Sequence, residues 1–174
     1  MTIIEMPRMM TDGHQVPERV TIHAMAEFLD FEPFDRRAYD FLLQQNLSAH
    51  YLITPSGCVQ KCLEDGMIGR HAGKGLNAGN IGIEILVPGL HTYGTFLDTI
   101  KREGWCPTKA WNATVELVRD LRKRYDLSDA KEWLTSDQGK GQWLVRHSDI
   151  RSGAKYDPGS GFDWQAFKKE VYNG

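Results

Sequence analysis

The chain has little of what marks several large classes of protein. Its 174 residues include three cysteines, an odd number that does not build the disulfide framework of a small secreted protein. No run approaches the roughly 18–20 apolar residues that span a bilayer. Residues 1–10 lack a basic segment followed by an apolar core, so no signal peptide is predicted. We therefore expect synthesis in the cytoplasm and no insertion into a membrane.

An excess of basic residues is also missing. The formal net charge is −2, which argues against nucleic acid as the main partner, because phosphate-binding surfaces raise the basic content. The sequence has no internal repeat and no low-complexity segment. We expect a monomer in which residues 1–174 form a single domain. Cys58, Cys62 and Cys106 are interpreted as buried or half-buried thiols, with a disulfide or a metal role as the alternative.

Apolar patterning and turn residues predict the secondary structure. Predicted strands cover residues 20–25, 49–53, 58–63, 80–87 and 143–147, and predicted helices cover 34–47, 108–125 and 164–172. Residues 54–57 favour a hairpin turn, and Pro88-Gly89 favours the end of a central strand. Segments 66–79, 90–106 and 128–142 are predicted to be loops. The order indicates an α/β fold with a mixed central β-sheet flanked by helices, and its long loops are expected to shape a groove.

Three side chains are candidate metal ligands. His147 ends an apolar strand, and Asp157 follows in a loop rich in glycine and proline that can fold back toward it. His23 lies inside another apolar strand, where a lone histidine is more often a core residue with one hydrogen bond. Together His23, His147 and Asp157 form a two-histidine, one-carboxylate set that suits a catalytic Zn²⁺ with one open position.

Two charged residues are candidates for the chemistry itself. Glu84 interrupts an apolar strand, where it forms a salt bridge or faces an edge, or else acts as a general base for an attacking water. Lys155 stands two residues before Asp157. It is either an ordinary surface lysine or the group that stabilises an oxyanion when water attacks a carbonyl.

Three further residues are candidates for substrate contact. His50 lies in the first strand of the expected hairpin, and His71 lies in the glycine-rich loop 69–75. Each either contacts substrate or plays a structural part behind the ligands. Trp105 falls in a predicted loop, where it would line a groove for a sugar ring. His91 and His14 are weaker candidates for substrate contact.

The motifs in their order resemble a known family, the zinc-dependent N-acetylmuramoyl-L-alanine amidases of type 2, which include phage lysozyme-type amidases and peptidoglycan recognition proteins. The resemblance covers residues 20–167. Its segments are TIH at 21–23, SAHYLI at 48–53, RHAG at 70–73, NIGIE at 80–84, RHSDI at 146–150 and KYDPG at 155–159.

The resemblance implies a role for each matched position. It implies that His23, His147 and Asp157 bind zinc, and that Glu84 and Lys155 are catalytic. Ala24 follows the first ligand where many members have histidine, threonine or serine. Ala49 precedes His50 where some members have tyrosine, which indicates the branch in which a glutamate assists the water.

The implied reaction is hydrolysis of the amide between N-acetylmuramic acid and L-alanine in peptidoglycan. The compact chain favours a phage endolysin, which would reach the wall in the host periplasm after holin-type release. A cytoplasmic amidase that recycles muropeptides is the alternative. A peptidoglycan-binding module without catalysis and a zinc peptidase that cuts within the stem peptide are the other hypotheses.

Overall fold

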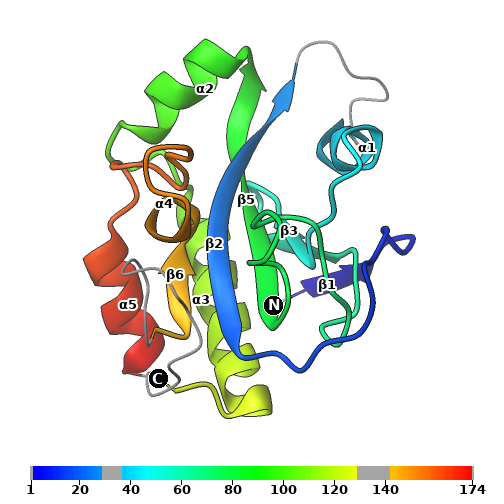
Figure 1. Ribbon diagram of the computed structural model, residues 1–174. Helices are drawn as coiled ribbons and strands as arrows, with labels where there is room; N and C mark the ends of the chain where they lie inside the picture. Colours follow the sequence, from blue (N-terminus) through cyan, green and yellow to red (C-terminus); the bar gives the residue numbers. More distant parts are fainter. Residues whose placement is uncertain (1, 29–36, 129–141, 174) are drawn as a thin grey trace.

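The computed structural model describes residues 2–28, 37–128 and 142–173 (Figure 1). The elements follow in the order β1 (Thr2–Glu5), β2 (Arg19–Phe28), α1 (Arg37–Gln44), β3 (Tyr51–Ile53), β4 (Cys58–Lys61), β5 (Asn80–His91), α2 (Tyr93–Ile100), α3 (Thr108–Tyr125), β6 (Leu144–Arg146), α4 (His147–Ile150) and α5 (Trp164–Tyr172). No helix in this described part is long and apolar enough to span a bilayer.

One six-stranded mixed sheet organises the fold, as the sequence predicts. The strands lie in the order β1-β4-β3-β5-β2-β6. The β3–β4 pair is antiparallel, which confirms the predicted hairpin, and the other pairs are parallel. The long strands β5 and β2 are neighbours inside the sheet, and their register sets His23 beside Glu84. Residues distant in the sequence therefore become neighbours on one face of the sheet.

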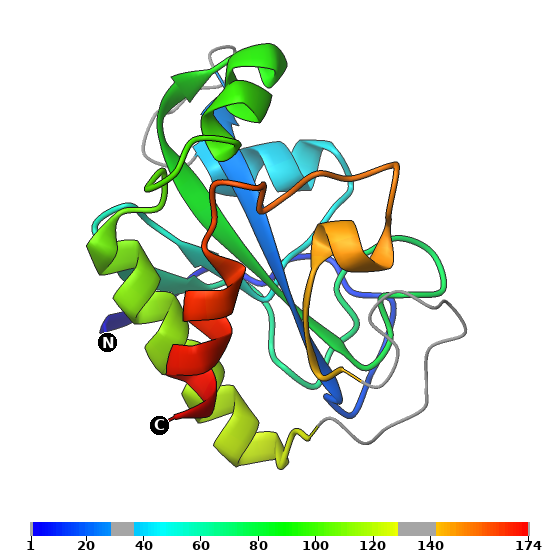
Figure 2. The ribbon, with the colours of Figure 1, turned by 90° about the vertical axis from the view of Figure 1, so that its left-hand side faces the viewer.

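The two faces of the sheet follow the alternation of side chains along each strand. Ile22 of β2 and Ile83 of β5 belong to the main core, which also contains apolar side chains of α3 and α5. His23 and Glu84, one position further along, lie on the opposite face. There Met25 packs with α1 in a second, smaller core. Figures 1 and 2 show α3 and α5 side by side, away from α1.

Several predicted boundaries need correction. Segment 90–106 is not a loop, because it contains α2, which begins at a Thr92 capping box that Thr95 completes. Strand β5 continues through Pro88-Gly89 to His91, with a register shift that lets Val87 and Leu90 face consecutive residues of β2. His147 begins α4 rather than ending a strand. Strand β1 was not predicted, and most of segment 128–142 lies outside the described residues.

The remaining elements agree with the patterns that predict them. Helix α3 buries one apolar stripe and ends at Asp126 in a left-handed conformation. Asp163 caps α5 by accepting a hydrogen bond from the Ala166 N–H. All three cysteines are free; Cys62 is buried and the other two are half-buried.

Candidate metal centre

His23, His147 and Asp157 meet at one point of the structure. The Asp157 Oδ2 atom lies 3.0 Å from His147 Nδ1 and 3.3 Å from His23 Nδ1. One ligand atom from each of the three lies within 4.8 Å of the others. A tetrahedral zinc shell with bonds of about 2.1 Å has edges of about 3.4 Å. The spacing and chemistry of these three side chains, which we call the ligand cluster, therefore fit Zn²⁺.

Local structure places each ligand. His23 is held by the long interior strand β2 and is 1% exposed. His147 is the first residue of α4, whose start is fixed because Asp149 accepts hydrogen bonds from the backbone and the guanidinium of Arg146. The Asp157 carbonyl accepts a hydrogen bond from the Ser148 N–H at 3.0 Å. That bond ties the loop carrying one ligand to the helix carrying another.

The pKa values in the cluster favour metal-binding protonation states. Burial, reinforced by His147, lowers the pKa of His23 to about 4, so its ring is neutral near pH 7. Burial opposes ionisation of Asp157, but contacts with the rings of His147 and His23 outweigh it and hold the Asp157 pKa well below its usual range. The neutral ring of His23 and the carboxylate of Asp157 thus face each other in the states that bind a metal.

Glu84 lies beside this cluster. Its Oε1 atom is 3.8 Å from His23 Nδ1, because the parallel register of β2 and β5 puts the two residues side by side. Burial and the nearby Asp157 raise its pKa well above the ordinary value, and Lys155 opposes that rise. Lys155 is exposed and lines the same cavity. The structure therefore brings Glu84 and Lys155 to the ligand cluster.

The cluster opens into a groove made of two adjoining cavities. The first, of about 250 Å³, is lined by all three ligands, Glu84 and Lys155, with the exposed rings of Tyr93 and Tyr156 at its rim. The second, of about 370 Å³, shares His71, His147 and Lys155 with the first. It adds the basic side chains of Lys74 and Arg151. One arm of the groove is thus aromatic and the other basic.

The three residues predicted to contact substrate take different places. His71 lines both cavities. His50 is fully buried, where its Nδ1 accepts a hydrogen bond from the Gly82 N–H and its Nε2 bonds the Met67 carbonyl. Trp105 is 6% exposed and packs against Phe162 in the main core. The structure does not bring His50 or Trp105 to the groove.

Tyr93, Tyr156, Lys74 and Arg151 line the groove but were not predicted from the sequence. Tyr156 stands between Lys155 and Asp157 in the KYDPG segment, so its position in that motif was an available signal. Tyr93 begins α2, a helix that was itself not predicted.

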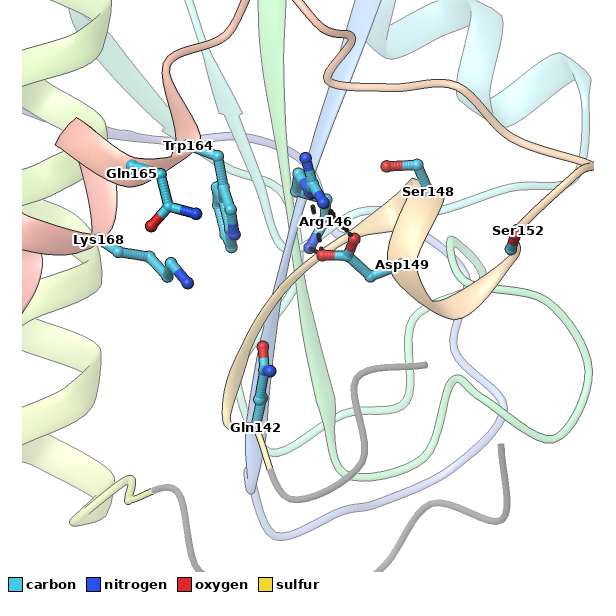
Figure 3. Close-up of a pocket in the computed structure, with 8 residues that line it drawn as sticks. All are labelled: Gln142, Arg146, Ser148, Asp149, Ser152, Trp164, Gln165 and Lys168. Carbon is cyan, nitrogen blue, oxygen red and sulfur yellow. Dashed lines mark hydrogen bonds and ion pairs between the residues drawn. The ribbon is translucent and has the colours of Figure 1, made fainter. Parts of the chain in front are cut away.

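A further cavity, of about 340 Å³, lies on the other side of α4 (Figure 3). The Arg146 guanidinium bonds Asp149 at 2.7 Å and lies 5.6 Å from the centre of the Trp164 ring. Figure 3 shows these side chains beside Gln165 and Lys168 of α5. Asp149 compensates the charge of Arg146 there, and the Lys168 ammonium lies 6.0 Å from the centre of the Trp164 ring.

Comparisons with known proteins agree with this arrangement. A family model described as N-acetylmuramoyl-L-alanine amidase matches residues 13–160. No curated protein sequence matches the chain. Among solved structures, the N-acetylmuramoyl-L-alanine amidase LysC from Clostridium intestinale URNW is 19% identical, with a TM-score of 0.67 and coverage of 99% of this chain and 98% of that one.

Two other solved structures share the fold. The structure of PlyL is 16% identical with a TM-score of 0.67, covering 98% of this chain and 97% of that one. A selenomethionine derivative of AmpD is 20% identical with a TM-score of 0.66, covering 96% and 93%. At these identities the likeness establishes the mixed sheet with flanking helices as a shared fold.

Proposed function

The chain belongs to the N-acetylmuramoyl-L-alanine amidase family, and we propose that it works as one domain that cuts the amide between N-acetylmuramic acid and L-alanine with a Zn²⁺ ion held by His23, His147 and Asp157. The convergence of these three side chains within 4.8 Å is the observation that carries the proposal. A bound Zn²⁺ would polarise the amide carbonyl and lower the pKa of a water molecule.

Glu84 and Lys155 supply the remaining chemistry. Glu84 takes a proton from the attacking water and passes it to the leaving amine of L-alanine. Its raised pKa suits a carboxylate that must both accept and donate a proton near neutral pH, and a nearby cation would bring that pKa down from its raised value. The Lys155 ammonium, exposed at the cavity, lies where it can stabilise negative charge that develops on the carbonyl oxygen.

The groove supports peptidoglycan as the substrate. Tyr93 and Tyr156, 61% and 58% exposed, present amphipathic rings of a kind that suits sugar faces. Lys74 and Arg151 of the other arm suit the carboxylates of a stem peptide. The amide that joins sugar to peptide would then lie at the ligand cluster, between the two arms.

We propose intact peptidoglycan, as for an endolysin, rather than recycled muropeptides as the preferred substrate. The exposed rings of Tyr93 and Tyr156 at the rim of the groove support this preference. A long glycan strand must lie across the groove, because it cannot enter end-on. We propose that it acts on the wall in the host periplasm, after a separate factor has permeabilised the membrane. We also expect a monomer, which light scattering of the purified protein checks.

The test uses purified sacculi, with and without a chelator. We expect mass spectrometry to find released stem peptides with a free L-alanine amine, and we expect no product until Zn²⁺ replaces what the chelator removed. A cut between peptide residues would instead indicate a peptidase. Binding to sacculi without any product would indicate a binding module. A faster rate on soluble muropeptides than on sacculi would contradict the preference for intact wall.

A further inference from the structure

His71 stands directly behind the ligand His23, on the side away from the ligand cluster. His23 Nε2 lies 3.0 Å from His71 Nδ1, and His71 Nε2 lies 3.1 Å from the Asn80 carbonyl oxygen. The two rings meet edge to face, with centroids 5.1 Å apart. A continuous hydrogen-bonded chain therefore runs from the backbone of β5 to a proposed zinc ligand.

The direction of this chain determines where each proton sits. A carbonyl oxygen only accepts hydrogen bonds, so His71 Nε2 carries the proton that it donates to Asn80. A neutral imidazole has one N–H, which leaves His71 Nδ1 as an acceptor. His23 must then donate through Nε2, and its Nδ1 keeps a lone pair facing Asp157 and Glu84. That lone pair is what a metal requires.

The surroundings of His71 hold its ring in place. The Asn77 Oδ1 atom accepts hydrogen bonds from the N–H groups of His71, Ala72 and Gly73, which fixes the loop. Gly82 of β5 lies against the ring, so that a Cβ atom there would come within 2.5 Å of His71 Cγ. Glycine at position 82 is therefore explained by close approach.

We infer that His71 is a positioning residue, which holds His23 in the one tautomer that can bind the metal. Gly82 leaves the space that the His71 ring occupies. The inference rests on the proposed function, since it concerns the same zinc site. It gives His71 a part distinct from substrate contact, although the residue also lines both cavities of the groove.

A matched pair of variants isolates the acceptor atom. Leucine and asparagine have the same branched shape, but only asparagine offers an oxygen near the place of His71 Nδ1. We expect His71→Leu to raise the Zn²⁺ dissociation constant about 10- to 100-fold, the usual effect of removing a partner of a metal-binding histidine. His71→Asn should recover at least half of that loss on a logarithmic scale. Competition with a chromophoric chelator measures both.

A second pair of variants tests the space beside Gly82 without changing either histidine. Gly82→Ala should displace the His71 ring and weaken Zn²⁺ binding at least about fivefold, by a smaller form of the same effect. Gly94→Ala is the control, because a Cβ atom at this position in α2 meets nothing closer than Thr92 Oγ1 at 3.9 Å. Its Zn²⁺ affinity should equal that of the wild type. Circular dichroism of the metal-free proteins shows that each variant has folded.

The outcomes separate this inference from the proposed function. If the wild type binds no Zn²⁺, the proposed function fails together with the inference. If the wild type binds Zn²⁺ and His71→Leu binds it equally well, only the inference fails. A His71→Leu protein with unchanged Zn²⁺ affinity but a raised KM would make His71 a substrate contact instead. Weakened binding in His71→Leu and Gly82→Ala, with recovery in His71→Asn, supports the inference.

Discussion

Two buried polar groups in this molecule have opposite hydrogen-bonding balances. The first is the ligand cluster of His23, His147 and Asp157. The second, which we call the Asp65 network, consists of Tyr51, Asp65, Arg124 and Tyr125. In the Asp65 network, Asp65 receives hydrogen bonds from the hydroxyl of Tyr51 at 2.5 Å, from Arg124 at 2.6 Å and from the hydroxyl of Tyr125 at 2.9 Å.

The difference shows which group is built to bind something. Every strong acceptor of Asp65 already has a donor from β3 or α3, so the network is complete and joins these elements. In the ligand cluster, the carboxylate of Asp157 and the lone pair of His23 Nδ1 converge as acceptors. Such a set gains most from a cation. The carboxylates of Asp65 and Asp157 are both largely buried, with side chains 5% and 13% exposed, and the ratio of donors to acceptors around them distinguishes the two places.

The largest expected effect comes from breaking the ligand cluster. His147→Ala removes one of three ligands, so both bound Zn²⁺ and amidase activity should be lost. Because a bound Zn²⁺ stabilises the transition state by several kcal/mol, we expect the rate on sacculi to fall about 1,000-fold or more. Elemental analysis and a turnover assay check this. Stoichiometric Zn²⁺ with a wild-type rate would refute the assignment of His147.

The next effect separates the chemistry from metal binding. Glu84→Gln keeps the shape of the side chain but cannot carry a proton, so kcat should fall about 10²- to 10⁴-fold while Zn²⁺ content stays unchanged. Glu64→Gln is the matched control, since Glu64 is exposed and pairs with Lys61 at the surface. Its kcat should equal that of the wild type. An equally active Glu84→Gln enzyme would exclude Glu84 as the base.

A change in the Asp65 network should affect stability alone. Asp65→Asn leaves buried donors without full partners, so we expect the free energy of unfolding to fall by about 2–4 kcal/mol. Asp120 also pairs with Arg124, but at the surface. Asp120→Asn should therefore lower the free energy of unfolding by less than about 1 kcal/mol. Urea titration measures both. A loss of Zn²⁺ affinity in Asp65→Asn would contradict the separation of the two groups.

The smallest effect concerns alkaline pH. Burial and Asp65 raise the pKa of Tyr51, so the folded protein keeps a phenol proton that the unfolded chain releases above about pH 10. The stability from this group is present below pH 10 and is lost as pH rises further. Between about pH 9 and about pH 10.5, the free energy of unfolding should therefore fall less for Tyr51→Phe than for the wild type. The difference between the two falls should be about 0.8 kcal/mol. Equal pH dependence would contradict this.

Much of the fold follows from local patterns in the sequence. Helix α3 has a sustained apolar stripe and β2 is rich in β-branched and apolar residues, so both elements were predicted. Helix α2 was not predicted, because its first turn depends on a threonine capping box rather than on periodicity. Strand β1 is short and exposed on every residue, which leaves no burial pattern to detect.

The candidate site, too, was predictable where it depends on local patterns and not where it depends on tertiary contacts. The residue types and motifs singled out His23, His147, Asp157, Glu84 and Lys155, and the structure brings all five to one cavity. The contact between His23 and Glu84 depends on which strands become neighbours, and one strand's pattern does not contain that information. Trp105 was expected in a groove because its segment was predicted to be a loop. After α2 this segment instead turns inward and packs the ring on Phe162.

The proposed ligands come from opposite ends of the chain, with His23 in an early strand and His147 and Asp157 near the C-terminus. An ion shared among them would cross-link the C-terminal part of the chain to the N-terminal part. Because a species that binds only the folded form shifts the folding equilibrium by mass action, chelation should make the C-terminal segment more susceptible to proteases than the rest of the protein.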